Sequence, residues 1–484
     1  MEQTYAYPAW LFTRGLSLVY LIAFMTLLPQ ARGLWGSQGV LPLAPYMKAV
    51  EAHIDGNRVW NVPSVFWLST SDDFIWGAAA TGAAFAFLAL IGFAQGWALL
   101  MCFVLYTSFC VSGQDFMAFQ WDGLLCELGF LALFMVPWNF DFSLGTATEP
   151  HWFVRGMFYI VLFKLMFLSG AVKLLSGDES WRDFSALNYH YLTQPLPNPL
   201  APFFHELPSW LHEIAVGLTF AIELILPFFI FWSRTRAWTT IGFVLLSLSI
   251  MASGNYAFFN WLTIILCFWL LPDTFWHPLF RTLHLPVEPI VAAMFPHPVM
   301  SFAMAVLAVL SGLWCLRTLL PDQALDFLSP VFSKAATFHI SQPYGLFATM
   351  TKSRPEIVIE GSSDGENWKE YEFKFKPGNV RKHPAVAAPF QPRLDWQMWF
   401  ASLGPEGQSP WVRTLMRRLA ENSPDVLVFF AENPFPETPP KYLRARLYKY
   451  EFNSVDSILE SDVWWSRSLD REYIPPLTLQ QLSL

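Results

Sequence analysis

The feature that most constrains this chain is a series of apolar segments long enough to cross a lipid bilayer. A bilayer core requires about 20 predominantly apolar residues per helix. Only 14% of all residues are charged, whereas soluble domains carry roughly 25%. The predicted fold class is therefore an all-α polytopic membrane domain of about nine transmembrane helices. The candidate spans are 11–28, 74–94, 96–113, 120–137, 152–175, 210–232, 236–253, 256–272 and 299–320.

The composition changes after Leu320, where the apolar segments end. Residues 1–330 hold 12 Lys and Arg against 20 Asp and Glu, whereas residues 331–484 hold 18 of each. More than half of the basic residues thus lie in the last third, as in a soluble domain. We predict three parts: a polytopic transmembrane domain (1–320), a linker (321–355) and a soluble C-terminal domain (356–484).

Local patterns in the last part predict a small α+β or β-rich fold. Alternating residues in 356–360 and 368–375 flank the turn sequence 362–365, which is a strand–turn–strand signal. Further strands are expected over 426–430 and 442–452, and an amphipathic helix over 409–422.

Two long connections, 29–73 and 176–209, interrupt the apolar segments. With nine spans, both fall on the same side as the C-terminal domain. Short loops on the other side carry Arg234, Arg236 and Arg281, and arginine in short loops marks the cytoplasm. We therefore predict a cytoplasmic N-terminus and an exoplasmic C-terminal domain, although Lys48 and Arg58 in the first long loop and Arg182 in the second oppose this orientation.

Ionisable residues inside the spans are the sharpest candidates for function. Counted from the loop that joins their helices, Lys164 and Glu223 lie 11 and 13 residues in, a difference of roughly 3 Å in depth. Glu127 lies near the same level, and Pro227 frees the backbone carbonyl of Glu223. A charge in hydrocarbon costs about 2.5–3.5 kcal/mol on insertion scales, so these groups require partners.

We accordingly expect one buried cluster of Glu127, Lys164 and Glu223, the candidate catalytic residues. Two interpretations remain open. The cluster is either an ion pair that only fixes helix packing, or a site that handles protons or binds substrate.

A second set of polar and aromatic residues is expected above this cluster, as a vestibule near the exoplasmic face. The alternative interpretation of these residues is ordinary anchoring at the membrane interface. Lys173, for example, lies near a helix end, from which it can extend its amine to the interface. The candidate binding residues are Asp122, Lys173, Asp178, Trp181, Arg182, Asp183, Tyr189, His190 and Gln194, with Trp396 and Trp399 from the C-terminal domain.

No cofactor or metal is expected. His205 and His212 are seven residues apart, whereas a helical metal site favours closer spacing. The five cysteines all lie in apolar segments, where they are expected to act as small buried hydrophobes. The first apolar run lacks a basic leader and a small-residue cleavage site, so it is expected to be a transmembrane helix. No basic block suggests nucleic acid.

Several long motifs resemble the lipase maturation factor family. They extend over nearly the whole chain: Gln120-Trp121-Asp122 with Glu127, 169–183, 186–199, the acidic helix around Glu223, and then Tyr344-Gly345, 354–365, 392–404 and 464–477. The resemblance implies a polytopic membrane protein that assists dimeric secreted lipases to fold, with its C-terminal region in the lumen of the endoplasmic reticulum. It provides no catalytic residues to transfer.

This sequence departs from the animal pattern in its compact loops and in lacking an N-glycosylation sequon and a retrieval signal. We therefore expect a bacterial inner membrane and a periplasmic C-terminal domain. The expected partners are membrane lipid and client secreted or periplasmic proteins.

Three functions remain open from the sequence. The first is a folding or assembly factor for exported proteins, whose client surface includes Trp396, Trp399 and Phe400; the alternative for these aromatics is core packing. The second is a membrane enzyme acting on a lipid, quinone or polypeptide, since the charged helix followed by a polar loop faintly resembles vitamin K-dependent carboxylase-like proteins. A cavity that reaches Lys164 would favour it. The third, a transporter, is opposed by the absence of repeats.

Overall fold

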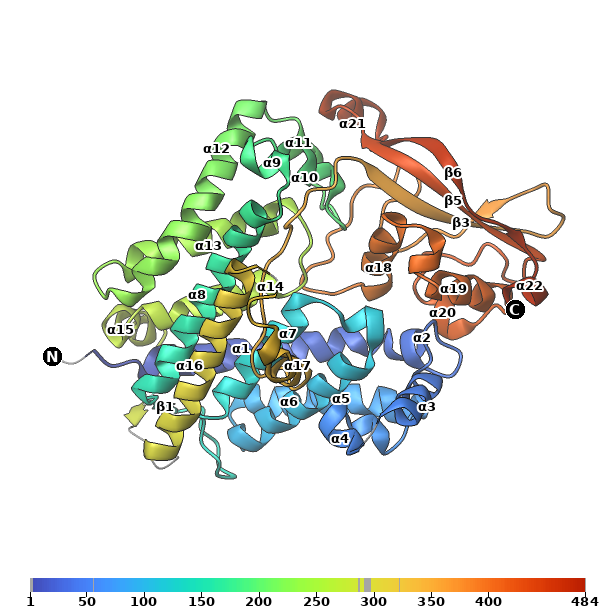
Figure 1. The fold of residues 1–484 in the computed structure, drawn as a ribbon. Coiled ribbons are helices and arrows are strands. Elements are labelled where there is room, and N and C mark those ends of the chain that lie inside the picture. The colour runs from blue at the N-terminus through green and yellow to red at the C-terminus, as the bar shows by residue number, and fades with distance from the viewer. Residues whose placement is uncertain (1–2, 55, 286–287, 291–296, 322, 484) are drawn as a thin grey trace.

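A computed structural model describes residues 3–54, 56–285, 288–290, 297–321 and 323–483 (Figure 1). Within these residues, seven helices are long and apolar enough to cross a membrane, and a bent helix pair raises the number to eight. They confirm a helical membrane domain. The long helices are α1 (Ala6–Leu27), α5 (Asp72–Ile91), α6 (Gln95–Ser112), α8 (Trp152–Leu175), α12 (Ser209–Phe220) with its continuations η3 (Ala221–Ile225) and η4 (Leu226–Phe231), α13 (Arg236–Ser253) and α16 (His297–Leu319).

Two of the nine predicted spans form shorter helices. Residues 120–137 yield α7 (Gln120–Ala132), in which 11 of 13 residues are buried. Residues 256–272 yield α14 (Phe259–Cys267) and η5 (Phe268–Leu270), which bend by 109° into α15 (Asp273–Thr282). A helix that is apolar on every face is expected wherever all faces are buried, in protein as well as in lipid. Helix α7 packs against α1, α6, α8 and α14. Its apolar composition is therefore explained by burial in protein rather than by contact with lipid.

Short helices fill both long connections. The first contains α2 (Ala31–Trp35), α3 (Leu43–His53), α4 (Arg58–Asn61) and η1 (Val65–Trp67), and the second contains α9 (Glu179–Arg182), α10 (Leu187–Thr193) and α11 (Ala201–His205). Both connections contact the C-terminal domain. Arg418 donates to the carbonyl of Gly39 in the first, and the backbone N–H of Val455 donates to Glu206 in the second. Elsewhere, β1 (Thr146–Thr148) pairs in parallel with β2 (Glu288–Ile290).

The C-terminal domain contains a four-stranded antiparallel sheet in the order β4-β3-β5-β6. Its strands are β3 (Arg354–Ser362), β4 (Lys369–Glu370), β5 (Tyr442–Phe452) and β6 (Trp465–Leu477). Helices α18 (Arg393–Ser402), α19 (Trp411–Ala420), α20 (Pro424–Leu427), α21 (Val455–Ser461) and α22 (Leu479–Leu482) complete the domain. Figure 1 shows α18 and α19 between the sheet and the membrane helices.

The secondary structure predicted for this domain from sequence patterns is partly correct. The predicted strands at 356–360 and 442–452 and the amphipathic helix at 409–422 are confirmed by β3, β5 and α19. The strand predicted at 426–430 is wrong, because the chain turns through α20 there and only Phe430 forms a bridge, to Phe373.

The membrane and C-terminal parts share one hydrophobic core. The rings of Trp121 and Trp396 lie 4.9 Å apart, and those of Phe116 and Trp411 lie 5.4 Å apart. The residues between the two parts form η6 (Asp326–Leu328), α17 (Ser329–Thr337) and then an extended strap, residues 341–351, that crosses the membrane helices. The proposed boundaries at 320 and 356 stay a prediction.

Candidate functional site

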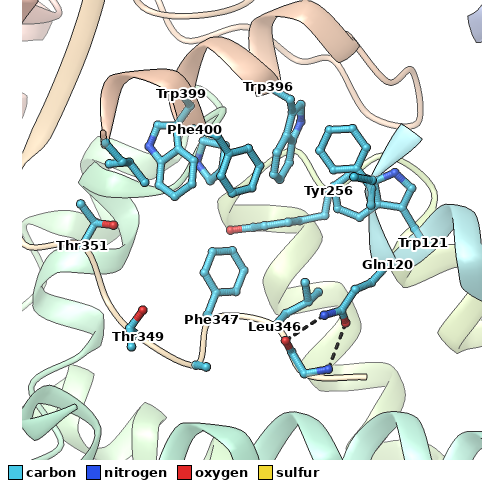
Figure 2. Close-up of a pocket in the computed structure, with 16 residues that line it drawn as sticks. Gln120, Trp121, Tyr256, Leu346, Phe347, Thr349, Thr351, Trp396, Trp399 and Phe400 are labelled. Carbon is cyan, nitrogen blue, oxygen red and sulfur yellow. Dashed lines mark hydrogen bonds between the residues drawn. The ribbon is translucent and has the colours of Figure 1, made fainter. Parts of the chain in front are cut away.

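An aromatic cavity of about 360 Å³, hereafter the outer cavity, lies where the strap, the membrane helices and α18 meet (Figure 2). Such a volume falls within the roughly 300–1,000 Å³ of typical ligand pockets. Aromatic rings from three parts of the chain converge on it. Its aromatic lining residues are Phe119, Trp121, Tyr256, Phe347, Trp396, Trp399 and Phe400.

The spacing of residues on α18 explains its contribution. Trp396, Trp399 and Phe400 stand at positions i, i+3 and i+4, which share one face of a helix. Figure 2 shows all three side chains above the space that Phe347 enters from below. Trp396 and Trp399 are only 3% and 8% exposed, whereas Phe400 is 46% exposed. The two tryptophans therefore belong largely to the core, and Phe400 lies at the rim.

The strap is held in place by one amide side chain. Gln120 donates to the carbonyl of Gly345 at 2.9 Å and accepts from its N–H at 3.0 Å, the pair of dashed lines in Figure 2. A Cβ at Gly345 would lie 2.8 Å from the side chain of Val172 on α8, so a glycine is required for this close approach. These contacts place Phe347 at the cavity.

A second, inner cavity of about 110 Å³ adjoins the first, and Tyr256, Leu346 and Phe347 line both. Its walls are mostly apolar, but they include an ion pair. Lys173 of α8 donates to both carboxylate oxygens of Glu223, at 2.7 and 2.8 Å, and to the carbonyl of Ser169 at 3.1 Å. Glu223 stands in the π-helical turn η3, and such turns are frequent at functional sites.

A hydrogen-bond chain runs along the wall between the cavities. Gln194 donates to the carbonyl of Ser253 at 2.7 Å, which turns its own amide oxygen toward Tyr256. The Tyr256 hydroxyl donates to that oxygen at 2.7 Å and lies 3.1 Å from Nε2 of His190. Because the hydroxyl has one proton, His190 must donate from Nε2. Burial lowers the pKa of His190 to about 4, with a further contribution from Lys173, so the ring is neutral at pH 7.

Lys164 belongs to a separate network. It donates to Glu127 at 2.7 Å and to Ser341 of the strap at 3.2 Å, and the hydroxyl of Tyr344 donates to the other oxygen of Glu127 at 2.5 Å. Lys164 and Glu127 are 0% and 1% exposed. Neither the outer nor the inner cavity is lined by Lys164.

The prediction that Glu223 joins Glu127 and Lys164 in one cluster is therefore wrong as to grouping. A Cβ at Gly170 would lie 2.9 Å from Cβ of Glu223, so Glu223 lies beside Gly170 of α8. Gly170 is six residues after Lys164, which corresponds to about 9 Å along the helix axis. Counting residues from the shared loop assumed that both helices enter the membrane at one level. The structure forms two ion pairs instead, and the roles proposed for all three residues stay predictions.

Asp122 contacts the C-terminal domain rather than a vestibule. Arg393 of α18 donates to both its oxygens at 2.8 Å, and the hydroxyl of Tyr106 donates to it at 2.5 Å. Arg354 similarly donates to the carbonyls of Leu192, Gln194 and Pro195. Sequence reasoning missed both arginines, because a buried arginine in a soluble-like segment resembles any surface arginine.

The other predicted binding residues occupy varied positions. Trp181 and His190 line the inner cavity, and Trp181 donates to the carbonyl of Phe347 at 2.9 Å. Asp178 accepts from the N–H groups of Ser180 and Met350, which joins α9 to the strap. Tyr189 is half-buried and lies beneath Lys352, whereas Arg182 and Asp183 are exposed to solvent.

The histidines that were considered for metal have other contacts. His212 bonds the side chain of Asn188 and the carbonyl of Phe204. Within the described residues, no group of three or more His, Cys, Asp or Glu side chains has an arrangement that could hold a metal ion.

Comparison with known proteins gives consistent matches over both parts of the chain. Residues 7–278 match the family described as lipase maturation factor transmembrane domain, and residues 340–475 match the lipase maturation factor C-terminal domain. The chain is 33% identical to lipase maturation factor 2 of Gallus gallus, over 98% of this chain and 81% of that protein. It is 32% identical to lipase maturation factor 1 of Bos taurus, over 97% and 88%.

No solved structure matches the chain. The family assignment therefore rests on the sequence matches, which include the segments that build both cavities: α7, the 176–209 connection, the strap and α18. With its apolar helices, this integral membrane protein belongs to the lipase maturation factor family.

Proposed function

We propose that this protein is a membrane-embedded factor that assists exported proteins, lipases among them, to reach their folded state. The observation that carries this proposal is an aromatic cavity at the junction of the two regions that match the family. The names of the relatives associate the family with lipase maturation. A cavity between membrane helices and a soluble domain would meet a client that has just crossed the membrane.

The client-binding surface that we propose is the rim of the outer cavity. Phe400 and Leu403 are 46% and 42% exposed and lie on the same cavity. Exposed apolar groups that border a concave site are typical of surfaces that bind other proteins. Trp396 and Trp399 would support this rim from beneath, and Thr349 and Thr351 of the strap would provide polar contacts.

We further propose that the C-terminal domain is exoplasmic, in the periplasm of a bacterium. Two observations and one general rule support this orientation. Both long connections contact the C-terminal domain. The short-loop arginines Arg234 and Arg236 lie near the N-terminus, where Arg236 donates to Tyr5. Arginine in short loops is typical of cytoplasmic faces.

The alternative, an enzyme with a charged intramembrane site, is not favoured. The relatives are named as maturation factors, and Lys164 is enclosed by Glu127, Ser341 and Tyr344 without lining either cavity.

Co-expression tests the proposal. An exported lipase would be produced in a bacterial host with and without this protein, and the activity per milligram of exported lipase would be measured. We expect the protein to raise that specific activity, and Phe400→Ser to reduce the gain. The matched control is Leu459→Ser on α21, because Leu459 is 72% exposed in the same domain but lines neither cavity.

Two results would contradict the proposal. One is an unchanged specific activity for every exported lipase tested. The other is an equal effect of Phe400→Ser and Leu459→Ser, which would show that the outer cavity does not bind the client.

A further inference from the structure

The inner cavity is bounded on one side by the helices that are most open to lipid. Only 22% of the most apolar window is buried in the helix Ser209–Phe231 and in α13, compared with 61% in α1, α6 and α8. Thr219 of the first helix and Leu246 and Ile250 of α13 line the cavity. Figure 1 shows α12 along the outer edge of the bundle. The cavity therefore lies next to the bilayer.

These two helices separate toward the cavity. A Cβ at Gly242 would lie 2.4 Å from the side chain of Leu226, so α13 and η4 are in close contact there. By contrast, α13 makes few contacts with α12, the segment that leads to the long connection. Leu246 and Ile250 follow one and two turns after Gly242, on the diverging part of α13. A lipid chain that entered from the bilayer between the two helices would pass Leu246 and Ile250.

The polar groups of the inner cavity have no net charge. Lys173 and Glu223 neutralise each other at 2.7 Å, and His190 is neutral at pH 7. Bringing a charged headgroup into this mostly apolar space would require desolvation without a countercharge. An uncharged headgroup is therefore favoured over a carboxylate or a phosphodiester.

His190, which lines this cavity, offers an acceptor to a ligand. His190 donates from Nε2 to Tyr256, so Nδ1 of the neutral ring carries a lone pair. Among the described residues, Nδ1 of His190 has no hydrogen-bond partner. A hydroxyl is an uncharged group that donates to such an acceptor and also accepts from neighbouring donors.

We propose that the inner cavity binds an uncharged, hydroxyl-bearing lipid of the monoacylglycerol or diacylglycerol class. Its hydroxyl donates to Nδ1 of His190 beside the Lys173–Glu223 pair. Its acyl chain leaves the cavity past Leu246 and Ile250, because a volume of about 110 Å³ holds only the headgroup and the first methylenes. This site differs from the client surface at Phe400 and does not depend on the proposed function.

Photolabelling of the full chain in phosphatidylcholine nanodiscs tests this proposal. The probe is a monoacylglycerol with a diazirine in its acyl chain, and mass spectrometry locates the labelled residues. We expect labelling on α12 and α13, about tenfold stronger than with a matched phosphatidylcholine probe, as the loss of one buried hydrogen bond implies. Unlabelled monooleoylglycerol should displace the probe, and oleate should not.

Two pairs of variants refine the test. Leu246→Trp fills the cavity and should abolish labelling, whereas Leu245→Trp, at a lipid-facing position that is 57% exposed, should not. His190→Phe removes the acceptor and should weaken labelling, and His190→Gln, which restores an acceptor, should recover part of it. Monodisperse elution and an unchanged melting temperature show that each variant is folded.

The proposal is overturned if the phosphatidylcholine probe labels the same residues as strongly, if oleate competes as well as monooleoylglycerol, or if Leu246→Trp leaves labelling intact. If Leu246→Trp does not fold, the competition between lipids on the unmodified protein decides the question alone. None of these results depends on client activation, so the two proposals can fail separately.

Discussion

Two lysine–glutamate pairs have different surroundings, although both lysines lie on α8. Lys164 and Glu127 are enclosed by Ser341 and Tyr344, and neither residue lines a described cavity. Lys173, nine residues after Lys164 on α8, and its partner Glu223 in η3 form part of the wall of the inner cavity. The chemistry of the two pairs is the same. Their difference shows that burial of a charge in a membrane domain does not by itself identify a site; access to an open volume must accompany it.

The largest effect is expected from Lys164→Met. Removing one partner of a buried pair leaves an uncompensated charge, and such losses cost about 3–5 kcal/mol. We expect a strong fall in the membrane level and the melting temperature of the variant. The double substitution Lys164→Met with Glu127→Gln should recover much of the loss, because no charge is left unpaired. An unchanged melting temperature for the single variant would contradict a structural role for this pair.

A smaller loss is expected from Lys173→Met. Glu223 would remain buried, but it borders a cavity in which it can be hydrated or protonated, so we expect about 1–3 kcal/mol. The denaturation midpoint in detergent measures this loss. If Lys173→Met destabilises as much as Lys164→Met, the proposed difference between the pairs does not exist. Lipid labelling of the inner cavity should decrease in this variant and remain unchanged in any folded variant at Lys164.

The strap provides an intermediate test. Gln120→Leu removes both hydrogen bonds to Gly345, and each typical hydrogen bond contributes about 0.5–1.5 kcal/mol. We expect modest destabilisation and a looser outer cavity, which would be visible as faster hydrogen exchange over residues 344–351. The pair Lys173–Glu223 belongs to other elements, so exchange in η3 should not change. Uniformly faster hydrogen exchange over the membrane domain would show that the strap and the membrane helices unfold together.

The effect that is smallest at neutral pH concerns His190, because its protonation changes stability only below about pH 6.5. The pKa of His190 is about 4 in the folded protein and about 6.5 when unfolded, so the unfolded chain binds an extra proton between these values. The contribution of His190 therefore lowers stability as the pH falls from 6.5 to 4, and it is constant above 6.5. His190→Gln should reduce the slope of melting temperature against pH in that window. Identical slopes for the two proteins would show that His190 is not protected from protonation.

The two pairs also show which features of the site were predictable. Charged residues within apolar runs were recognisable at Lys164, Glu127 and Glu223, since ionisable groups in such runs require partners. Lys173 was identified as a candidate but was assigned to the vestibule, because its position near a helix end also suits an interface residue. The choice of partner depended on the relative depth of α8 and α12. That depth is set by the short helices α9, α10 and α11 between them, whose packing no periodicity predicts.

The C-terminal domain offers a similar contrast. The alternating sequences of β3 and β5 were sufficient to predict strands. In β5 burial also alternates over most of the strand, as expected where one face packs on the core, whereas β3 is buried on both faces. The segment 426–430 is a continuous apolar run, yet it turns, because Ser423 and Pro424 begin the short helix α20. Arg393 and Arg354 were not recognised, since their partners, Asp122 and the backbone carbonyls of 192–195, lie far away in the sequence.

The sequence alone established three properties of this protein: a helical membrane domain, a soluble C-terminal part and membership of its family. These properties follow from local features, namely the length of the apolar segments, the depletion of charge and the long motifs. Only the tertiary structure decided which lysine meets which glutamate, that α7 is buried in protein, and that two cavities meet at Tyr256 and Phe347. The physical reason is that hydrophobicity and periodicity act between neighbours along the chain. Partner choice and open volume, by contrast, depend on the three-dimensional packing of distant segments.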